Sequence, residues 1–450
     1  MYKRDTTPMK KFDYTYWSSP VAPQTFIGLS PFTPADKYFR FDPVIAYWSN
    51  VGGNSLMDAG KGYIVRAPFN FSEASTAIYN GTFSGVPNNG TITTPILVST
   101  SNFNLIGNPY PSAISADLFL SETSNVPVID ATIYLWTHNT PITLNQYTSN
   151  DYAAYNYLGG TGTSSAAPNT GINNSVPTGK IASGQAFFVK GLSSANVTFK
   201  NSMRIIGNNT QFFKMTNPTS NTNFIDFEKH RIWLDIVNST GAYKQTLLGY
   251  ATNATLGLDR GLDGVFLNAG NSVILYSLAE TNLLTIQGRP LPFDDNDEVD
   301  LGFYSATSDT FQIGLSNYDG LFLEQDIYLK DKLLNVIHNL KEAPYSFSSL
   351  LGTNNTRFSI VYKDNALLNG EFTLDNFDVV LYKPNENLNI KTNTIVMKSV
   401  KIYDSRGRLL FDKKDINATE TSFNIGTTNQ ALIVKITTTD DKVITRKYVN

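Results

Sequence analysis

Two acidic clusters contain the residues whose types and spacing most clearly suggest chemistry. The stretch FDDNDEVD holds four aspartates and one glutamate, and the stretch GLDRGLDG holds two aspartates four positions apart. Carboxylate oxygens are the hard ligands that Ca²⁺ prefers, although neither cluster fits the twelve-residue loop that closes on a glutamate. The alternative is that both clusters are solvated turns. The candidate ligands for a structural Ca²⁺ are Asp259, Asp263, Asp294, Asp295, Asp297 and Asp300.

No catalytic constellation stands out in the sequence. The chain has three histidines and no cysteine, so it contains no thiolate nucleophile and no zinc–thiolate site. The histidines lack the spacing of zinc motifs, and there is no G-x-S-x-G elbow or phosphate-binding glycine loop that leads into a helix. Carboxylates are spread along the chain rather than gathered as the carboxyl pair of a glycosidase. We therefore predict that the protein is not an enzyme and has no cofactor beyond the Ca²⁺ candidate.

Tryptophan and tyrosine recur in the first part of the chain. Flat aromatic faces stack on sugar rings, so these residues are compatible with a carbohydrate-binding module and with surface glycans as partners. The alternative is that they fill the core, where large aromatic side chains usually lie. The residues in question are Trp17, Trp48 and Trp136 with Tyr16, Tyr47 and Tyr134.

Charge and hydropathy exclude several classes of partner. The formal net charge is −3 over 450 residues, and no lysine- and arginine-rich block is present, so we do not expect nucleic acid as a partner. No apolar run approaches the roughly 18 residues of a membrane-spanning helix. The N-terminal stretch MYKRDTTPMKKFDYTYW also lacks the apolar segment of a signal peptide. If the protein is exported, we expect this chain to be part of a longer precursor.

Short apolar runs separated by Gly, Pro, Asn and Ser indicate many strands joined by turns. We predict an all-β fold of tandem β-sandwich domains. A tail at 1–10 precedes a jelly-roll-like sandwich at 11–213, and a polar linker at 214–223 leads to a second sandwich at 224–364. Residues 371–450 contain seven short strand patterns, which predict a small immunoglobulin-like sandwich. The stretches SADLFLSE and DKLLNVIHNL are the helix candidates, and both are short.

The stretch KSVKIYDSRGRLLFDKK in the last domain predicts a β-hairpin. Val400 and Ile402 alternate on one strand face, and Asp404 at the start of the turn can accept bonds from the backbone ahead of it. Gly407 supplies the positive φ that closes such a turn. Two further strand patterns follow, ALIVKITTT and KVITRKYV, with an Asp-Asp-Lys turn between them.

Residues 371–450 resemble the C-terminal sorting domain of the type IX secretion system of Bacteroidetes, and are most similar to its type C variant. The stretches SVKIYDSRGRLL, NQALIVKI and KVITRKYV carry the resemblance, in the order that the family has. The commoner form has Pro-Asn-Pro near its start and Gly-x-Tyr in its penultimate strand, where this chain has YKPNENLNI and NQALIVKI. The preceding sandwiches, with YTYWSSPV and LIGNPYPS, look like segments that precede such domains in large flavobacterial surface proteins.

The resemblance implies export across the outer membrane to the cell surface, with the last domain as a folded signal. Its implied partners are an outer-membrane translocon barrel and an accessory shuttle barrel. From residue 391 onward eleven basic residues face six acidic ones, so this segment can meet an acidic receptor. An exposed edge strand can also be captured by strand addition. The candidate recognition residues are Asp404, Arg406, Gly407, Arg408, Lys442, Arg446, Lys447, Tyr448 and Val449.

The expected function of the preceding sandwiches follows from the same resemblance. They are expected to form an adhesin or a gliding-related surface protein. Two alternatives stay open: a carbohydrate-binding module, or the accessory region of a secreted polysaccharide-degrading enzyme.

Overall fold

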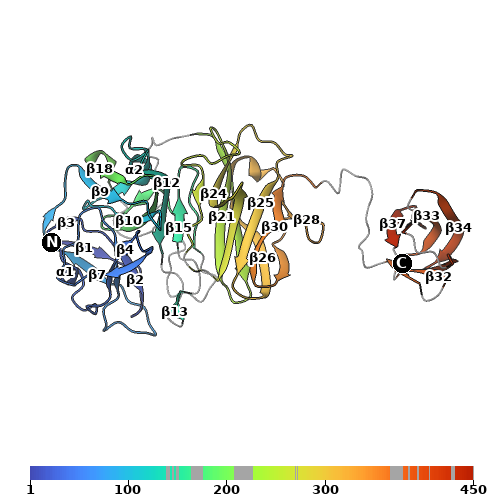
Figure 1. The fold of residues 1–450 in the computed structure, drawn as a ribbon, viewed down its shortest axis with the longest axis horizontal. Coiled ribbons are helices and arrows are strands. Elements are labelled where there is room, and N and C mark those ends of the chain that lie inside the picture. The colour runs from blue at the N-terminus through green and yellow to red at the C-terminus, as the bar shows by residue number, and fades with distance from the viewer. Residues whose placement is uncertain are drawn as a thin grey trace. The chain divides into compact units, whose positions relative to one another are not determined.

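The computed structural model describes residues 1–137, 142–143, 146–147, 152–163, 176–206, 227–268, 270, 272–364, 379–383, 386–392, 395–404, 406–426 and 431–448. Strands make up most of these residues and the helices are short, which confirms the all-β fold (Figure 1). The chain divides into two compact units: unit 1, Met1–Lys363, and unit 2, Asp364–Asn450. The two sandwiches predicted at 11–213 and 224–364 thus belong to one unit. The linker predicted at 214–223 lies outside the described residues.

The N-terminal region of unit 1, residues 1–206, is built from small antiparallel sheets. Two of them have four strands, in the orders β2-β6-β4-β5 and β10-β17-β12-β15. Their strands are β2 (Tyr14–Trp17), β4 (Tyr38–Asp42), β5 (Tyr47–Asn50), β6 (Tyr63–Arg66), β10 (Phe103–Gly107), β12 (Ile129–Trp136), β15 (Tyr152–Tyr155) and β17 (Ala186–Gly191).

Smaller sheets and short helices complete this region. The smaller sheets are β16-β11-β19, β18-β9, β1-β7, β3-β8 and β13-β14. Their elements are β1 (Tyr2–Asp5), β3 (Val21–Ala22), β7 (Asn80–Phe83), β8 (Val86–Pro87), β9 (Ile92–Ile96), β11 (Ala113–Ser115), β13 (Ile142–Thr143), β14 (Gln146–Tyr147), β16 (Lys180–Ile181), β18 (Ala195–Phe199) and β19 (Arg204–Ile205). The helical turns are α1 (Phe26–Leu29), α2 (Ala116–Ser121) and η1 (Asn201–Met203).

The prediction of a tail at 1–10 is wrong. Strand β1 pairs along its whole length with β7, and Met9 forms an isolated bridge with Ala77. The sequence YKRD carries little apolar signal, since Tyr2 is its one apolar contact with the core and the backbone pairing with β7 holds the rest of the strand.

The two helix candidates have different outcomes. SADLFLSE contains α2, which the Ser115 hydroxyl caps by accepting a hydrogen bond from the Leu118 amide, while Phe119 is buried. DKLLNVIHNL forms a hairpin instead, for which the helix prediction is wrong. Its turn is held by the Asp331 carboxylate, which accepts bonds from the next amides, and by Asn335 at φ 54°. Side chains that bond to the local backbone favour such turns over helices.

The second region of unit 1 is one large sheet in the order β28-β27-β30-β25-β23-β24-β21-β20-β26-β29, with β22 paired to β24. β21 and β24 run parallel, and the other pairs are antiparallel. The elements are β20 (Lys229–Asn238), β21 (Tyr243–Ala251), β22 (Gly264–Val265), β23 (Val273–Ala279), β24 (Asn282–Pro290), β25 (Val299–Ser305), β26 (Asp309–Tyr318), η2 (Gly320–Leu323), β27 (Tyr328–Asp331), β28 (Val336–Asn339), β29 (Tyr345–Ser349) and β30 (Gly352–Val361).

Three hydrophobic clusters hold unit 1 together, and alternation along the strands assigns side chains to them. In β20, Ile232 and Leu234 point into the core of the large sheet, whereas Trp233 between them points to the other face. In β12, Ile133 belongs to the core of the N-terminal region and Tyr134 to the same cluster as Trp233. The middle cluster therefore joins the two regions, whose sheets lie beside each other (Figure 1). This burial on both faces explains the mostly apolar sequence of β12, and in β21 it extends to the polar side chains of Lys244, Gln245 and Thr246.

Hydrogen bonds cross the same boundary between the two regions. The Trp233 indole donates to the Gly160 carbonyl at 2.8 Å, and the Tyr134 hydroxyl donates to the Val265 carbonyl at 2.6 Å. The Arg260 guanidinium reaches the Leu120 carbonyl at 2.9 Å. Polar groups at this depth are costly to bury unpaired, so these bonds fix how the two regions dock.

The described residues of unit 2 form seven strands in two sheets, β31-β32-β35 and β34-β33-β36-β37, which confirms the small immunoglobulin-like sandwich. The strands are β31 (Val379–Tyr382), β32 (Asn387–Thr392), β33 (Met397–Asp404), β34 (Leu409–Ala418), β35 (Glu420–Asn424), β36 (Leu432–Thr438) and β37 (Val443–Tyr448). Leu388 and Phe423 of one sheet pack with Ile402 and Val434 of the other in a single core.

Candidate recognition surface on the C-terminal unit

The hairpin between β33 and β34 is organised by Asp404. Its buried carboxylate accepts hydrogen bonds from the Arg406 amide at 3.0 Å and the Arg408 amide at 2.9 Å, and from Arg408 Nε at 3.0 Å. These bonds, led by the one from the Arg408 amide, hold the pKa of Asp404 below its ordinary value. Gly407 has φ 81°, as the turn requires. Asp404 and Gly407 therefore shape the turn, while the side chains of Arg406 and Arg408 are the exposed groups.

Strand β37 is an edge of the four-stranded sheet. Within the described residues it pairs with β36 alone. Ile444 points into the core, whereas Thr445 and Lys447 are exposed. Its second edge thus offers backbone groups to an added strand, and its alternate side chains point to solvent.

The register of the sheet brings most of the predicted recognition residues to one end. Asp404 lies opposite Leu432, which in turn lies opposite Tyr448. The hairpin and the last residues of β37 are therefore two strand spacings, about 10 Å, apart. Lys442 is at the other end of β37, roughly 17 Å away along the strand, where it pairs with Asp440. Val449 lies outside the described residues.

The outer face of this sheet carries a row of side chains that the sequence analysis missed. Cross-strand pairing aligns Leu409 with Tyr403, Tyr403 with Ile433, and Ile433 with Lys447. Leu409 is 47% exposed and Ile433 is 38% exposed. The apolar residue Ile433 at an outward position of ALIVKITTT could have indicated this row, but a β-branched residue there also matches ordinary strand propensity.

Much of the basic excess of unit 2 is paired locally. Lysine and arginine form ion pairs in the couples Lys391–Glu420, Lys398–Asp441, Lys401–Asp412, Arg408–Asp404 and Lys442–Asp440. In the described part of unit 2, Lys414, Lys435 and Lys447 are exposed and form no ion pair. Lys435 and Lys447 lie on β36 and β37, next to the open edge, whereas Lys414 lies on β34 at the opposite edge of the sheet.

The carboxylates of the acidic cluster at 294–300 interact with neighbouring side chains and with a backbone amide of the chain itself. Asp297 accepts the Tyr250 hydroxyl at 2.6 Å and pairs with Arg289. Asp294 accepts the Asn296 amide at 2.9 Å. The remaining two candidates form ion pairs, Asp295 with Lys363 and Asp300 with Lys332, each at 2.6 Å.

The other two calcium candidates hold a loop in shape. Asp263 accepts the Asp259 amide at 2.6 Å and the Gly288 amide at 2.8 Å, and Asp259 accepts from the Thr255 hydroxyl at 3.0 Å. Burial raises the pKa of Asp263 to about 7. This loop presents Arg260 to the N-terminal region. Among the described residues no group of three or more His, Asp or Glu could hold a metal ion, so the six candidates do not form one ligand set.

The aromatic residues of the first region mostly fill cores. Trp17 is 1% exposed, Tyr16 6% and Tyr134 1%. Tyr16 stacks on Trp136 at 5.5 Å and meets Trp48 edge-on at 5.8 Å, within the cluster that joins the two regions. The core interpretation therefore holds for these residues, and the exposed ring of Tyr47 is the exception.

Comparisons with known proteins divide the chain where the contacts do. Residues 1–362 match the family described as "Domain of unknown function (DUF8693)", and this match covers most of the chain. The chain belongs to the DUF8693 family. Residues 367–450 match a second family, described as "Domain of unknown function (DUF8694)". The first match spans both regions of unit 1, and the second lies within unit 2.

Other comparisons add little to this assignment. None of the curated proteins matches the chain. The solved structure titled "Central Fibronectin-III array of RIM-binding protein" is similar at 9% identity with a TM-score of 0.14, over 40% of this chain and 86% of that one. Within the described part of the chain, no helix has the length and apolar character to cross a membrane.

Proposed function

We propose that unit 2 is a folded export signal, recognised by the translocon barrel and shuttle barrel of a type IX secretion system, and that unit 1 is its cell-surface passenger. The observation that carries the proposal is the open edge of β37 with the Arg406 hairpin at the same end of the sheet. An unpaired edge gives affinity through main-chain bonds, and neighbouring exposed side chains give selectivity.

The chemistry of the surrounding face supports the same partner. Lys435 and Lys447 can meet acidic groups of a receptor, while Tyr403 and Ile433 supply apolar contact between them. The passenger then reaches the extracellular face as an adhesin or a gliding-related surface protein. The alternatives, a carbohydrate-binding module or an accessory region of a polysaccharide-degrading enzyme, differ in the ligand that unit 1 holds rather than in the role of unit 2.

The test compares two charge reversals on the same sheet face of the full chain. Lys447→Glu changes the edge strand β37, and Lys414→Glu makes the same change on the opposite edge strand β34. Secretion is measured in a host with a working type IX system, as the fraction of chain that external protease digests in intact cells. We expect Lys447→Glu to reduce this fraction several-fold and Lys414→Glu to leave it unchanged.

Deletion of 442–450 is the stronger form of the experiment. It removes the whole edge strand, so surface exposure is expected to stop while unit 1, followed by its tryptophan fluorescence, stays folded. Normal export of the truncated chain, or equal export of both charge-reversal variants with folded unit 2, would contradict the proposed role of β37.

A further inference from the structure

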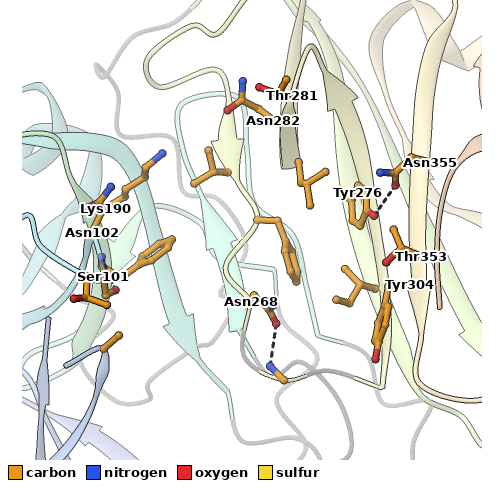
Figure 2. Close-up of a pocket in the computed structure, with 18 of the residues that line it drawn as sticks. Ser101, Asn102, Lys190, Asn268, Tyr276, Thr281, Asn282, Tyr304, Thr353 and Asn355 are labelled. Atoms are coloured by element: carbon orange, nitrogen blue, oxygen red, sulfur yellow. Dashed lines mark hydrogen bonds between the residues drawn. The ribbon is translucent and has the colours of Figure 1, made fainter. Parts of the chain in front are cut away.

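Unit 1 contains a pocket of about 1090 Å³ where its two regions meet (Figure 2). One wall is formed by the segment Thr100–Phe103 with Lys190 of β17, and the other by the segment from Val265 to Asn268 with strands β23, β25 and β30. Ligand sites typically measure about 300–1,000 Å³, so this pocket is large enough for a molecule of several rings.

Strand alternation explains why the pocket exists. In β23, Val273 and Leu275 point into the core of the large sheet, so Ile274 and Tyr276 point to the opposite face. On β20 that opposite face carries Trp233, which packs against the N-terminal region. Further along the sheet the N-terminal region no longer covers the face, and the side chains of β23, β25 and β30 line an open space instead.

The lining is rich in amides, hydroxyls and aromatic rings. Four asparagines contribute, Asn102, Asn268, Asn282 and Asn355. Hydroxyl groups come from both walls, and rings come from Phe266 and Tyr304 among others. Among the described lining residues Lys190 is the one charged side chain, so the pocket lacks the cation cluster that phosphates need. Amides bind pairs of hydroxyls, and flat rings pack on the C–H faces of sugars.

One element of the lining depends on a specific glycine. The Tyr276 hydroxyl donates to Asn355 Oδ1 at 2.8 Å, which leaves the Asn355 amide hydrogens to serve as donors. Gly302 lies opposite Tyr276 in the sheet, and a Cβ there would lie 2.2 Å from the Tyr276 ring and 2.6 Å from Asn355 Oδ1. Any larger residue at 302 would displace this pair. The pocket is therefore a built feature of the sheet.

We propose that this pocket binds an uncharged glycan segment, held by the asparagine amides and stacked on the aromatic rings. The site is distinct from the recognition surface of unit 2, and the proposal does not rest on the export role. It gives unit 1 a ligand whether the chain is secreted by the type IX system or by another route.

The experiment exposes the purified full chain to a printed array of neutral, uronic-acid-containing and sulfated oligosaccharides. Titration calorimetry with the neutral glycan that binds best then compares Asn355→Ala with Asn196→Ala, an exposed asparagine of β18 outside the pocket. We expect Asn355→Ala to weaken binding about tenfold, which is the loss of roughly one hydrogen bond in the site, and Asn196→Ala to have no effect.

A second variant tests the same pair from the neighbouring strand. Gly302→Ala displaces the Tyr276–Asn355 pair without removing either residue, and it is expected to weaken binding at least as much. Because Asn355→Ala leaves the Tyr276 hydroxyl without its acceptor, fluorescence-detected urea unfolding of both variants is measured, and binding is compared under conditions where each variant remains folded. Absence of binding to any neutral glycan would overturn the proposal. So would equal affinities of all variants, or binding to sulfated glycans alone that Lys190→Met abolishes.

Discussion

The two units of this chain treat charge in opposite ways. Unit 1 buries an ion pair between Asp331 and Arg357, whose side chains are 1% and 7% exposed, and the guanidinium lies over the adjoining rings of Phe347 and Phe358, 4.8 Å from each centroid. Among the described residues of unit 2 every ion pair has at least one exposed side chain, and Lys435 and Lys447 are exposed. Buried pairs hold one internal arrangement, whereas exposed charges remain available to a partner.

The same contrast appears in how the sheets are covered. In unit 1 the face of β21 that carries Leu247 packs on the N-terminal region and the face that carries Leu248 packs on the large-sheet core. In unit 2 a single core lies between the sheets, and the outer face with Tyr403 and Ile433 has no layer over it among the described residues of that unit. We infer that the sheets of unit 1 are built to pack on each other, whereas the outer face of the four-stranded sheet of unit 2 is available to a partner.

The strongest way to break this contrast is to remove the buried anion of unit 1. Asp331→Ala leaves the Arg357 guanidinium buried without its partner and the Tyr345 hydroxyl without its acceptor. We expect a loss of about 3–5 kcal/mol in the free energy of unfolding of unit 1. All four tryptophans precede residue 364, so tryptophan fluorescence during urea unfolding reports on unit 1 alone.

The matched control is Asp300→Ala, which opens the exposed pair with Lys332 and is expected to cost below about 1 kcal/mol. Equal costs at Asp331 and Asp300 would show that burial does not distinguish the two kinds of pair.

The next largest effect concerns the single core of unit 2. Ile402→Ala removes three heavy atoms from a fully buried site and is expected to cost about 2–5 kcal/mol. Unit 2 has no tryptophan, so circular dichroism should shift toward earlier unfolding while the fluorescence transition stays in place. Coincident shifts of both signals would mean that the two units unfold together.

Asp263 in unit 1 and Asp404 in unit 2 should contribute to the pH dependence of stability with opposite signs. Burial raises the pKa of Asp263 to about 7, so the folded state of unit 1 binds more protons than the unfolded state between about pH 4 and pH 7. Its stability therefore falls as the pH rises through this window, by at most about 1.4 kcal/mol from pH 5 to pH 6. Asp263→Asn should flatten this slope, as fluorescence-detected urea unfolding at each pH would measure.

Asp404 supplies the opposite case in unit 2. Its pKa lies below the ordinary value, so its stabilising effect is present above about pH 4 and is lost as the pH falls toward the folded-state pKa. Acid should therefore weaken unit 2, followed by circular dichroism, below about pH 4, which is beneath the window in which protonation of Asp263 stabilises unit 1. A slope of unit 2 below about pH 4 that Asp404→Asn leaves unchanged would contradict this assignment.

Local features of the fold could be predicted from the sequence. The Asp404 and Gly407 turn depends on side-chain-to-backbone bonds and on a positive φ within a few residues, and both are visible in the sequence. The seven strand patterns of unit 2 could also be counted, because turn residues separate them. The recognition residues, by contrast, were predicted from the resemblance, and their arrangement at one end of the sheet emerged only from the cross-strand register.

Long-range features could not be predicted. Asp295 forms its ion pair with Lys363, and the Trp233 indole donates its hydrogen bond to the Gly160 carbonyl. Both partners are far away in the sequence, and no local pattern specifies them. The mostly apolar sequence of β12 does indicate burial on both faces, but not which layer covers the second face. Without that information, the sequence could not predict that the two sandwiches form one unit. The pocket at their junction could not be predicted for the same reason.

The smallest expected effect sharpens the role of the hairpin in unit 2. Gly407 has φ 81°, a conformation that costs a residue with a side chain about 1 kcal/mol, and no atom lies within 4 Å of the position that its Cβ would take. Gly407→Ala should therefore lower the stability of unit 2 through the backbone alone, and Gly407→Asn should lower it less, because asparagine tolerates this conformation. In unit 1, Gly257→Ala is the control, because Gly257 lies outside the positive-φ region and its Cβ would lie 3.6 Å from Thr255 Oγ1, an ordinary van der Waals contact. Circular dichroism should detect the first change and fluorescence should detect neither. Equal destabilisation by alanine and asparagine at 407 would contradict the assignment of this cost to the backbone conformation.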